Sequence, residues 1–258
     1  MDAGGGSAQP ARAVDTAVEK ARADDAHLPR RTAALRGSDL LLVLVFGIGS
    51  PFLIGLLVAR LPHSVWAVLL LLALQSVLLL TAIHFVVVRR RGVGWAALGF
   101  RPAARRWYVA AVGFALLVIP AAGLLNLAIQ ELTGEPLRNP QLRLLAPDGF
   151  SSTGLIGVLI TTGLVVPIAE EATFRGLLYG WLRRRWSVPA AALGSALAFS
   201  IVHGIPLLIP AIALLGIVLA LVYEKSGSLW PSIVLHGMFN ATMATMLYLA
   251  LAASVPLE

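Results

Sequence analysis

The sequence predicts an all-α fold, a polytopic bundle of about seven transmembrane helices, with six to eight spans compatible with the pattern. The 258 residues are 58% hydrophobic and only 13% charged, and the mean hydropathy is +0.84. A soluble domain carries about 25% charged residues. The apolar residues also form long runs, and roughly 20 such residues are enough for a helix to cross a bilayer. A large soluble core is therefore excluded, and the lack of cysteine excludes disulfides, thiolate ligands and thiol nucleophiles.

The chain divides into a polar tail and a membrane domain. Residues 1–37 are rich in Ala, Gly, Arg and Asp, which predicts a disordered cytoplasmic tail. Residues 38–254 form the predicted transmembrane domain. Its predicted spans are 40–58, 64–88, 107–130, 153–180, 188–203, 206–224 and 230–250.

Basic residues indicate the orientation of these spans, because they are enriched on the cytoplasmic side of membrane proteins. They collect in alternate loops, which favours seven spans with the N-terminus in the cytoplasm. The net charge of +7 is then explained by topology and contact with anionic lipid rather than by nucleic acid. The basic residues in question are Arg30, Arg31, Arg36, Arg89, Arg90, Arg91, Arg101, Arg105, Arg106, Arg183, Arg184, Arg185 and Lys225.

The loop between the second and third predicted spans contains three aromatic residues, Trp95, Phe100 and Trp107. Aromatic side chains are enriched at the level of the lipid headgroups. This loop is either an amphipathic anchor at that level or a simple linker.

Two adjacent carboxylates, Glu170 and Glu171, lie inside the fourth predicted span. A carboxylate at this depth costs at least about 3 kcal/mol, so such residues usually serve a function. Arg175 is four residues after Glu171 and shares its helix face, which predicts a salt bridge. Glu170 has no basic partner in its own helix and is the freer carboxylate. Pro167 should kink the helix just before the pair.

Polar residues on two other spans repeat this pattern. Phe199 and His203 are four residues apart, and so are His236 and Asn240, so each pair shares a helix face. At 1.5 Å per residue, Glu170, His203 and His236 lie about 18, 21 and 9 Å from the cytoplasmic ends of their helices. Three helices can therefore bring these groups to one layer. Taken alone, each His could be a helix-packing donor, and Asn240 alone is more often a packing residue.

A carboxylate base with imidazole and amide donors is suited to hydrolysis. Glu170 would take a proton from water, His203 and His236 would position that water or hold the oxyanion, and Asn240 would donate a further hydrogen bond. A zinc site remains an alternative, with Glu170, His203 and His236 as ligands and a fourth position for water. The metal-free interpretation is favoured because these ligands come from three separate helices. A proton-coupled transporter is another alternative, although no internal repeat is evident.

Three ordered motifs resemble those of a known family. EEATFR at 170–175, FSIVH at 199–203 and HGMFN at 236–240 are similar to the EExxxR, FxxxH and HxxxN signatures of the CAAX protease and bacteriocin-processing family. These proteins are intramembrane endopeptidases related to the Ras-converting enzyme. The resemblance covers about 95–245, and the catalytic core that it implies spans about 150–245.

The resemblance implies a role for each motif residue. Glu170 would activate water with His203, while His236 and Asn240 would hold the oxyanion. The supporting residues would be Glu171, Arg175 and Phe199. The family is often described as a metalloprotease group, so zinc stays open as a cofactor.

The resemblance also implies partners and a location. The substrate would be a membrane-associated protein or peptide, and lipids would surround the chain. Bacterial relatives process varied peptides or act in bacteriocin immunity, so the alternative is a non-proteolytic scaffold or regulatory partner protein in the membrane. The Ala- and Arg-rich composition is typical of bacterial proteins, which predicts a multi-pass protein of a bacterial plasma membrane.

Overall fold

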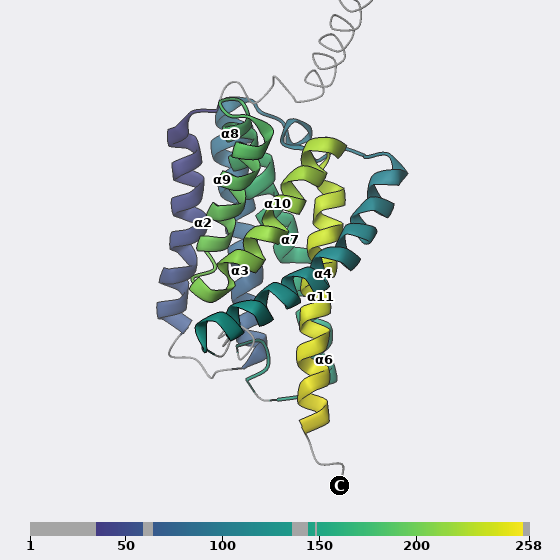
Figure 1. The fold of residues 1–258 in the computed structure, drawn as a ribbon. Coiled ribbons are helices and arrows are strands. Elements are labelled where there is room, and N and C mark those ends of the chain that lie inside the picture. Colours follow the sequence, from purple (N-terminus) through teal and green to yellow (C-terminus); the bar gives the residue numbers. More distant parts are fainter. Residues whose placement is uncertain (1–34, 59–63, 136–143, 148, 255–258) are drawn as a thin grey trace, which may run out of the picture.

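The computed structural model describes residues 35–58, 64–135, 144–147 and 149–254. Most of the predicted tail, residues 1–34, lies outside the described residues. The described chain is a bundle of helices (Figure 1). In order these are α2 (Gly37–Val58), α3 (Val65–Ile83) continued by η2 (His84–Arg89), η3 (Trp95–Leu98), α4 (Arg105–Thr133), a composite helix of α6, η4, α7, η5 and α8 (Ser152–Arg183), α9 (Val188–Ile201), η6 (Pro206–Leu208), α10 (Ile209–Ser226) and α11 (Leu229–Ser254).

The all-α polytopic prediction is confirmed. Within the described ranges, five helices are long and apolar enough to cross a membrane: Val65–Arg89, Arg105–Thr133, Ser152–Arg183, Pro206–Ser226 and Leu229–Ala253. One predicted span is shorter, because α9 has 14 residues. The helix α2 has 22 residues, Gly37–Val58. At about 21 Å, α9 is shorter than a hydrocarbon core of about 30 Å.

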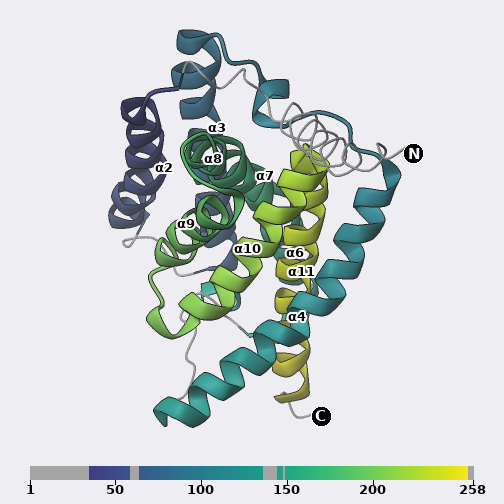
Figure 2. The same ribbon diagram turned by 45° about the horizontal axis from the view of Figure 1, so that its top comes forward.

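The helices pack around the composite helix that carries the glutamates. α9 packs along α10, α2 packs along α3, and α4 crosses obliquely over α10 and α11 (Figures 1 and 2). The largest buried cluster joins this composite helix to α9 and α10, with Leu177, Tyr179 and Phe199 almost fully buried. Glu171 and Arg175 of the fourth span are thus enclosed by protein rather than lipid, as the high cost of charge in hydrocarbon requires.

The aromatic loop between the second and third spans packs against the bundle instead of forming a simple linker. Leu98 is buried, and its carbonyl accepts a hydrogen bond from the Tyr223 hydroxyl at 3.1 Å. Gly99 adopts a φ of 108°, which side chains disfavour, and its carbonyl accepts the backbone N–H of Leu229 at 2.9 Å. This segment therefore fixes the turn between α10 and α11, and so the start of the helix that carries His236.

The closest approach of α9 and α10 depends on Gly216. A Cβ at this position would lie 2.9 Å from both the Cα and the Cβ of Ala196. The Gly216 carbonyl also accepts a hydrogen bond from Arg175, so this contact adjoins the polar residues of the fourth span.

Gly216→Ala should therefore lower the free energy of unfolding by about 1–3 kcal/mol through overpacking. Gly113→Ala in α4 is the matched control, because open space surrounds Gly113 and alanine favours a helix. Thermal unfolding of the two variants in the same detergent measures the difference. Equal melting temperatures would show that α9 and α10 separate without cost.

Candidate active site

The two glutamates lie on a helix that two π-helical segments interrupt. The π-helical segments η4 (Thr161–Val165) and η5 (Ala172–Tyr179) enclose the short α7 (Val166–Glu171). Pro167 lies at the start of α7 and explains the upstream change, because it has no N–H and its ring clashes with the preceding turn. The predicted interruption before the glutamates thus takes the form of a π segment. Such segments are frequent at functional sites.

Glu171 and Arg175 form the predicted salt bridge. The Arg175 Nη1 donates to Glu171 Oε1 at 2.9 Å, and both side chains are 0% exposed. The Arg175 Nη2 donates to the carbonyl of Gly216 at 3.2 Å and ties the pair to α10. Because a buried charge without a partner costs several kcal/mol, each member of this pair requires the other.

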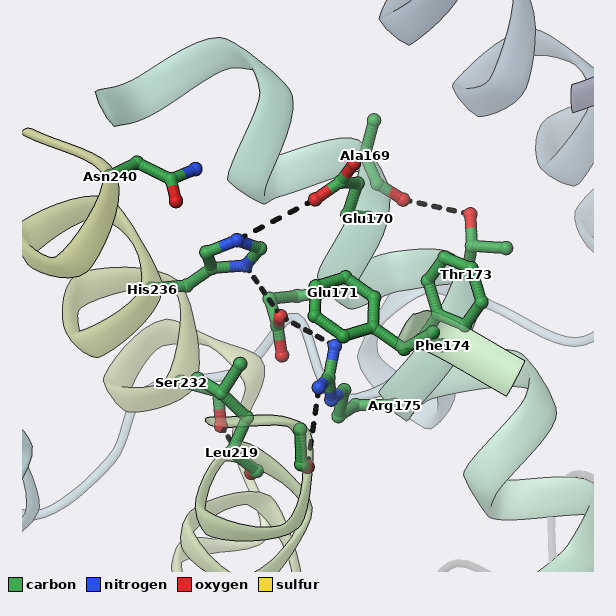
Figure 3. Close-up of polar contacts among 12 residues, drawn as sticks. Ala169, Glu170, Glu171, Thr173, Phe174, Arg175, Leu219, Ser232, His236 and Asn240 are labelled. Carbon is green, nitrogen blue, oxygen red and sulfur yellow. Dashed lines mark hydrogen bonds and ion pairs between the residues drawn. The ribbon is translucent and has the colours of Figure 1, made fainter. Parts of the chain in front are cut away.

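The same carboxylate oxygen also holds His236, as Figure 3 shows. His236 Nδ1 lies 2.8 Å from Glu171 Oε1. A carboxylate can only accept, so Nδ1 carries the proton and a neutral ring has its lone pair on Nε2. The sequence assigned Glu171 to Arg175 alone. It did not predict that Glu171 would fix the tautomer of a histidine 65 positions away.

The second ring nitrogen of His236 faces the other glutamate. His236 Nε2 lies 3.5 Å from Glu170 Oε2 (Figure 3). The side chain of Glu170 is 24% exposed, whereas that of His236 is 2% exposed. Glu170 therefore has a basic partner from α11, and of these two groups it is the one that reaches open space.

Phe199 connects the remaining residues of the site. Its ring lies 4.8 Å from the ring of His203 and 5.5 Å from that of His236, both edge-on. The Arg175 guanidinium carbon lies 4.4 Å from its centroid, a cation–π contact. Such a contact is worth about 2 kcal/mol in a desolvated site. The Phe199 side chain thus touches the two imidazoles and the buried cation at once.

His203 follows the last turn of α9 and is half-buried. Its Nδ1 lies 2.7 Å from the carbonyl of Phe199. Since a carbonyl only accepts, Nδ1 carries the proton and Nε2 of the neutral ring can accept a hydrogen bond. His203 is therefore linked to His236 through Phe199.

Asn240 lies one turn beyond His236 on α11 and makes a different contact from the one predicted. Its Nδ2 donates to the backbone carbonyl of Thr162 at 2.9 Å. This amide N–H is therefore engaged by the π segment η4, outside the contacts that join His236 to the glutamates.

The zinc alternative finds no ligand set. Over the part of the chain that the structure describes, no group of three or more His, Asp or Glu side chains could hold a metal ion. Glu170 and His236 face each other, but His203 does not complete a set with them. The metalloprotease interpretation of these three residues therefore has no support, and no step of the chemistry below involves a metal.

Two serines that the sequence did not assign to the site anchor its helices. Ser195 Oγ donates to the carbonyl of Phe174 at 2.9 Å, and Ser232 Oγ donates to that of Leu219 at 3.1 Å. Each serine lies one turn before a site residue, since Ser195 precedes Phe199 and Ser232 precedes His236 by four positions. That spacing was a usable signal, because it extends each polar face by one turn.

Comparison with known families agrees with this geometry. Residues 152–242 match the family model described as Type II CAAX prenyl endopeptidase Rce1-like. This part of the chain is similar to that family. No curated protein and no solved structure matches the chain.

The matched region gives the site a chemical context. It runs from α6 to the middle of α11 and contains every residue of the contacts above. The family is one of intramembrane proteases, so a peptide or protein substrate and a membrane environment follow. The chain is a multi-pass membrane protein.

Loss of Glu171 alone should damage the protein more than loss of both charges. Glu171→Leu leaves the Arg175 guanidinium buried without its carboxylate, which costs about 3–5 kcal/mol. The double variant Glu171→Leu/Arg175→Met removes both charges and should recover most of that stability, as judged by thermal unfolding in detergent. A double variant less stable than Glu171→Leu would contradict this account of the pair.

Proposed function

We propose that this chain is an intramembrane endopeptidase that hydrolyses peptide bonds of membrane-associated proteins or peptides with a water activated by Glu170. The observation that carries the proposal is the contact between Glu170 and His236. A partly exposed carboxylate faces the Nε2 of an imidazole whose other nitrogen is fixed by Glu171. A base with access to water beside an oriented acid–base partner is the arrangement that hydrolysis needs.

In this mechanism Glu170 takes a proton from water, and the resulting hydroxide attacks the scissile carbonyl. The neutral His236 accepts that proton from Glu170 at Nε2. The imidazolium then stabilises the oxyanion and delivers the proton to the leaving amine, which breaks the C–N bond. His203 orients the water through its Nε2 lone pair. The products are a carboxylate and an amine.

The two neighbouring glutamates would thus have separate roles. Glu171 is fully buried and bound to Arg175, so it acts as a positioning residue for His236. Glu170 would contact the reacting water and is the catalytic carboxylate. Burial separates the roles, although the two side chains are chemically identical.

The proposed location rests on the sequence. We infer a bacterial plasma membrane from the Ala- and Arg-rich composition, and a cytoplasmic N-terminus because arginines collect in alternate loops. Membrane lipids and a peptide substrate are the partners that this site requires, and a regulatory partner protein is compatible with it.

Glu170→Gln should abolish cleavage and leave the protein folded in the membrane. The amide keeps the shape of the side chain but cannot take a proton, so we expect a loss of about 100-fold or more in kcat. A purified assay with a prenylated CAAX peptide as the probe measures this. Mass spectrometry of peptide termini from wild-type and variant cells then identifies natural cleavage products.

Glu131→Gln is the matched control, because Glu131 lies exposed near the end of α4. It should retain full activity. If Glu170→Gln processes the probe at the wild-type rate, the proposed role of Glu170 fails. If the wild-type protein yields no cleavage products, the protease proposal fails and a scaffold or regulatory protein takes its place.

The orientation can be tested directly because the chain contains no cysteine. Ser187→Cys lies in the loop predicted to face the cytoplasm, and Glu135→Cys lies in a loop predicted to face outward. Both native residues are exposed. A membrane-impermeant maleimide should label Glu135→Cys in intact cells and Ser187→Cys only after lysis. The opposite pattern would place the N-terminus outside.

A further inference from the structure

The hydrogen-bond register before Pro167 leaves one backbone carbonyl without its helical partner. In η4 the N–H of Val166 donates to the carbonyl of Thr161, a bond that spans five residues. The next carbonyl in the same register is that of Thr162, and its partner would be the nitrogen of Pro167. That nitrogen carries no hydrogen. In a bilayer no bulk water replaces such a bond, so a neighbouring group must supply it.

Asn240 supplies the missing bond. Its Nδ2 donates to the Thr162 carbonyl at 2.9 Å across the contact between η4 and α11. The approach of the two segments is close at this point, because a Cβ on Gly237 would overlap the Gly163 carbonyl oxygen. The two helices thus meet backbone to backbone at Gly237, the residue directly after His236.

We infer that Asn240 is a positioning residue that replaces the hydrogen bond removed by Pro167 and so fixes the helix that carries Glu170. One N–H of its Nδ2 serves the Thr162 carbonyl. Asn240 and His236 lie on one face of α11. Through them α11 binds the composite helix twice, at the Thr162 carbonyl before Pro167 and at Glu170. The catalytic consequence rests on the proposed function, whereas the structural role stands without it.

The sign of a stability change tests the structural role. Asn240→Leu keeps the size of the side chain but leaves the Thr162 carbonyl without a donor, and we expect the Tm to fall by about 2–4 °C. If Asn240 served only an oxyanion, replacing a polar group with leucine inside the membrane would leave the Tm unchanged or raise it. Either of those results overturns the inference.

Thr242→Val is the matched control on the same helix. The Thr242 hydroxyl donates only to the carbonyl of Met238 in its own helix, which already belongs to the helical ladder. Its removal should leave the Tm within about 1 °C of the wild type. An equal fall in Asn240→Leu and Thr242→Val would mean that the Thr162 contact has no special role.

A second background gives the decisive comparison. Pro167→Ala restores a backbone N–H that can serve the freed carbonyl, so Asn240→Leu should cost at most half as much Tm in that background as in the wild type. An equal penalty in both backgrounds overturns the inference. If Pro167→Ala does not fold, the sign of the Asn240→Leu shift decides alone.

The kinetic comparison uses the prenylated CAAX peptide as the probe. Asn240→Leu should lower kcat per folded protein by about tenfold or more with KM unchanged. In the Pro167→Ala background the same change should lower kcat less. An oxyanion donor would lose about 100- to 1,000-fold in both backgrounds, which would overturn the inference. If no variant cleaves the probe, the protease proposal fails while the Tm comparison still decides the role of Asn240.

Discussion

The site depends on one buried carboxylate oxygen. Glu171 Oε1 accepts from both Arg175 and His236, and all three side chains are almost fully buried. Charge is tolerated inside a bilayer only where protein groups surround and pair it. The other contacts of the site follow from that requirement. The Arg175 guanidinium donates to the Gly216 carbonyl on α10 and lies over the Phe199 ring of α9. The imidazole of His236 comes from α11. Three helices are therefore held to the fourth by the need to enclose a single ion pair.

This arrangement also explains why two glutamates stand side by side. A single carboxylate cannot be both tightly paired and free to accept a proton, because the partner that keeps it ionised also competes for its lone pairs. Glu171 is held by two donors, and Glu170 keeps an open side and one distant nitrogen at 3.5 Å. The fixed tautomer of His236 joins the two environments. The ring can accept at Nε2 because Glu171 holds the proton at Nδ1.

Much of the fold was predictable, because apolar runs of sufficient length leave few alternatives in a membrane. The polar residues Glu170, Glu171 and Arg175 could also be predicted, because a charged side chain inside a membrane span costs several kcal/mol and is therefore usually functional. The details that depend on tertiary contacts were not predictable. A π segment has no local sequence signature, and the partner of Asn240 is a carbonyl that becomes free only after the register changes. The bounds of the predicted span 188–203 agree with α9 (Val188–Ile201) to within two residues, but its 14 residues are fewer than the roughly 20 that a helix needs to cross a bilayer.

The two π segments show why the motifs belong together. Each π segment is bound by a side chain of a neighbouring helix, and irregular backbone at membrane depth needs such partners within the protein. Asn240 of α11 donates to a carbonyl of η4, and Ser195 of α9 donates to a carbonyl of η5. These are the same two helices that carry His236 and Phe199. Each helix therefore stabilises one irregular segment beside the glutamates and places one ring against them. A substitution that breaks either of these contacts would also shift the ring carried by the same helix. The orientation of the Glu170 side chain and the positions of the neighbouring rings therefore depend on the same contacts.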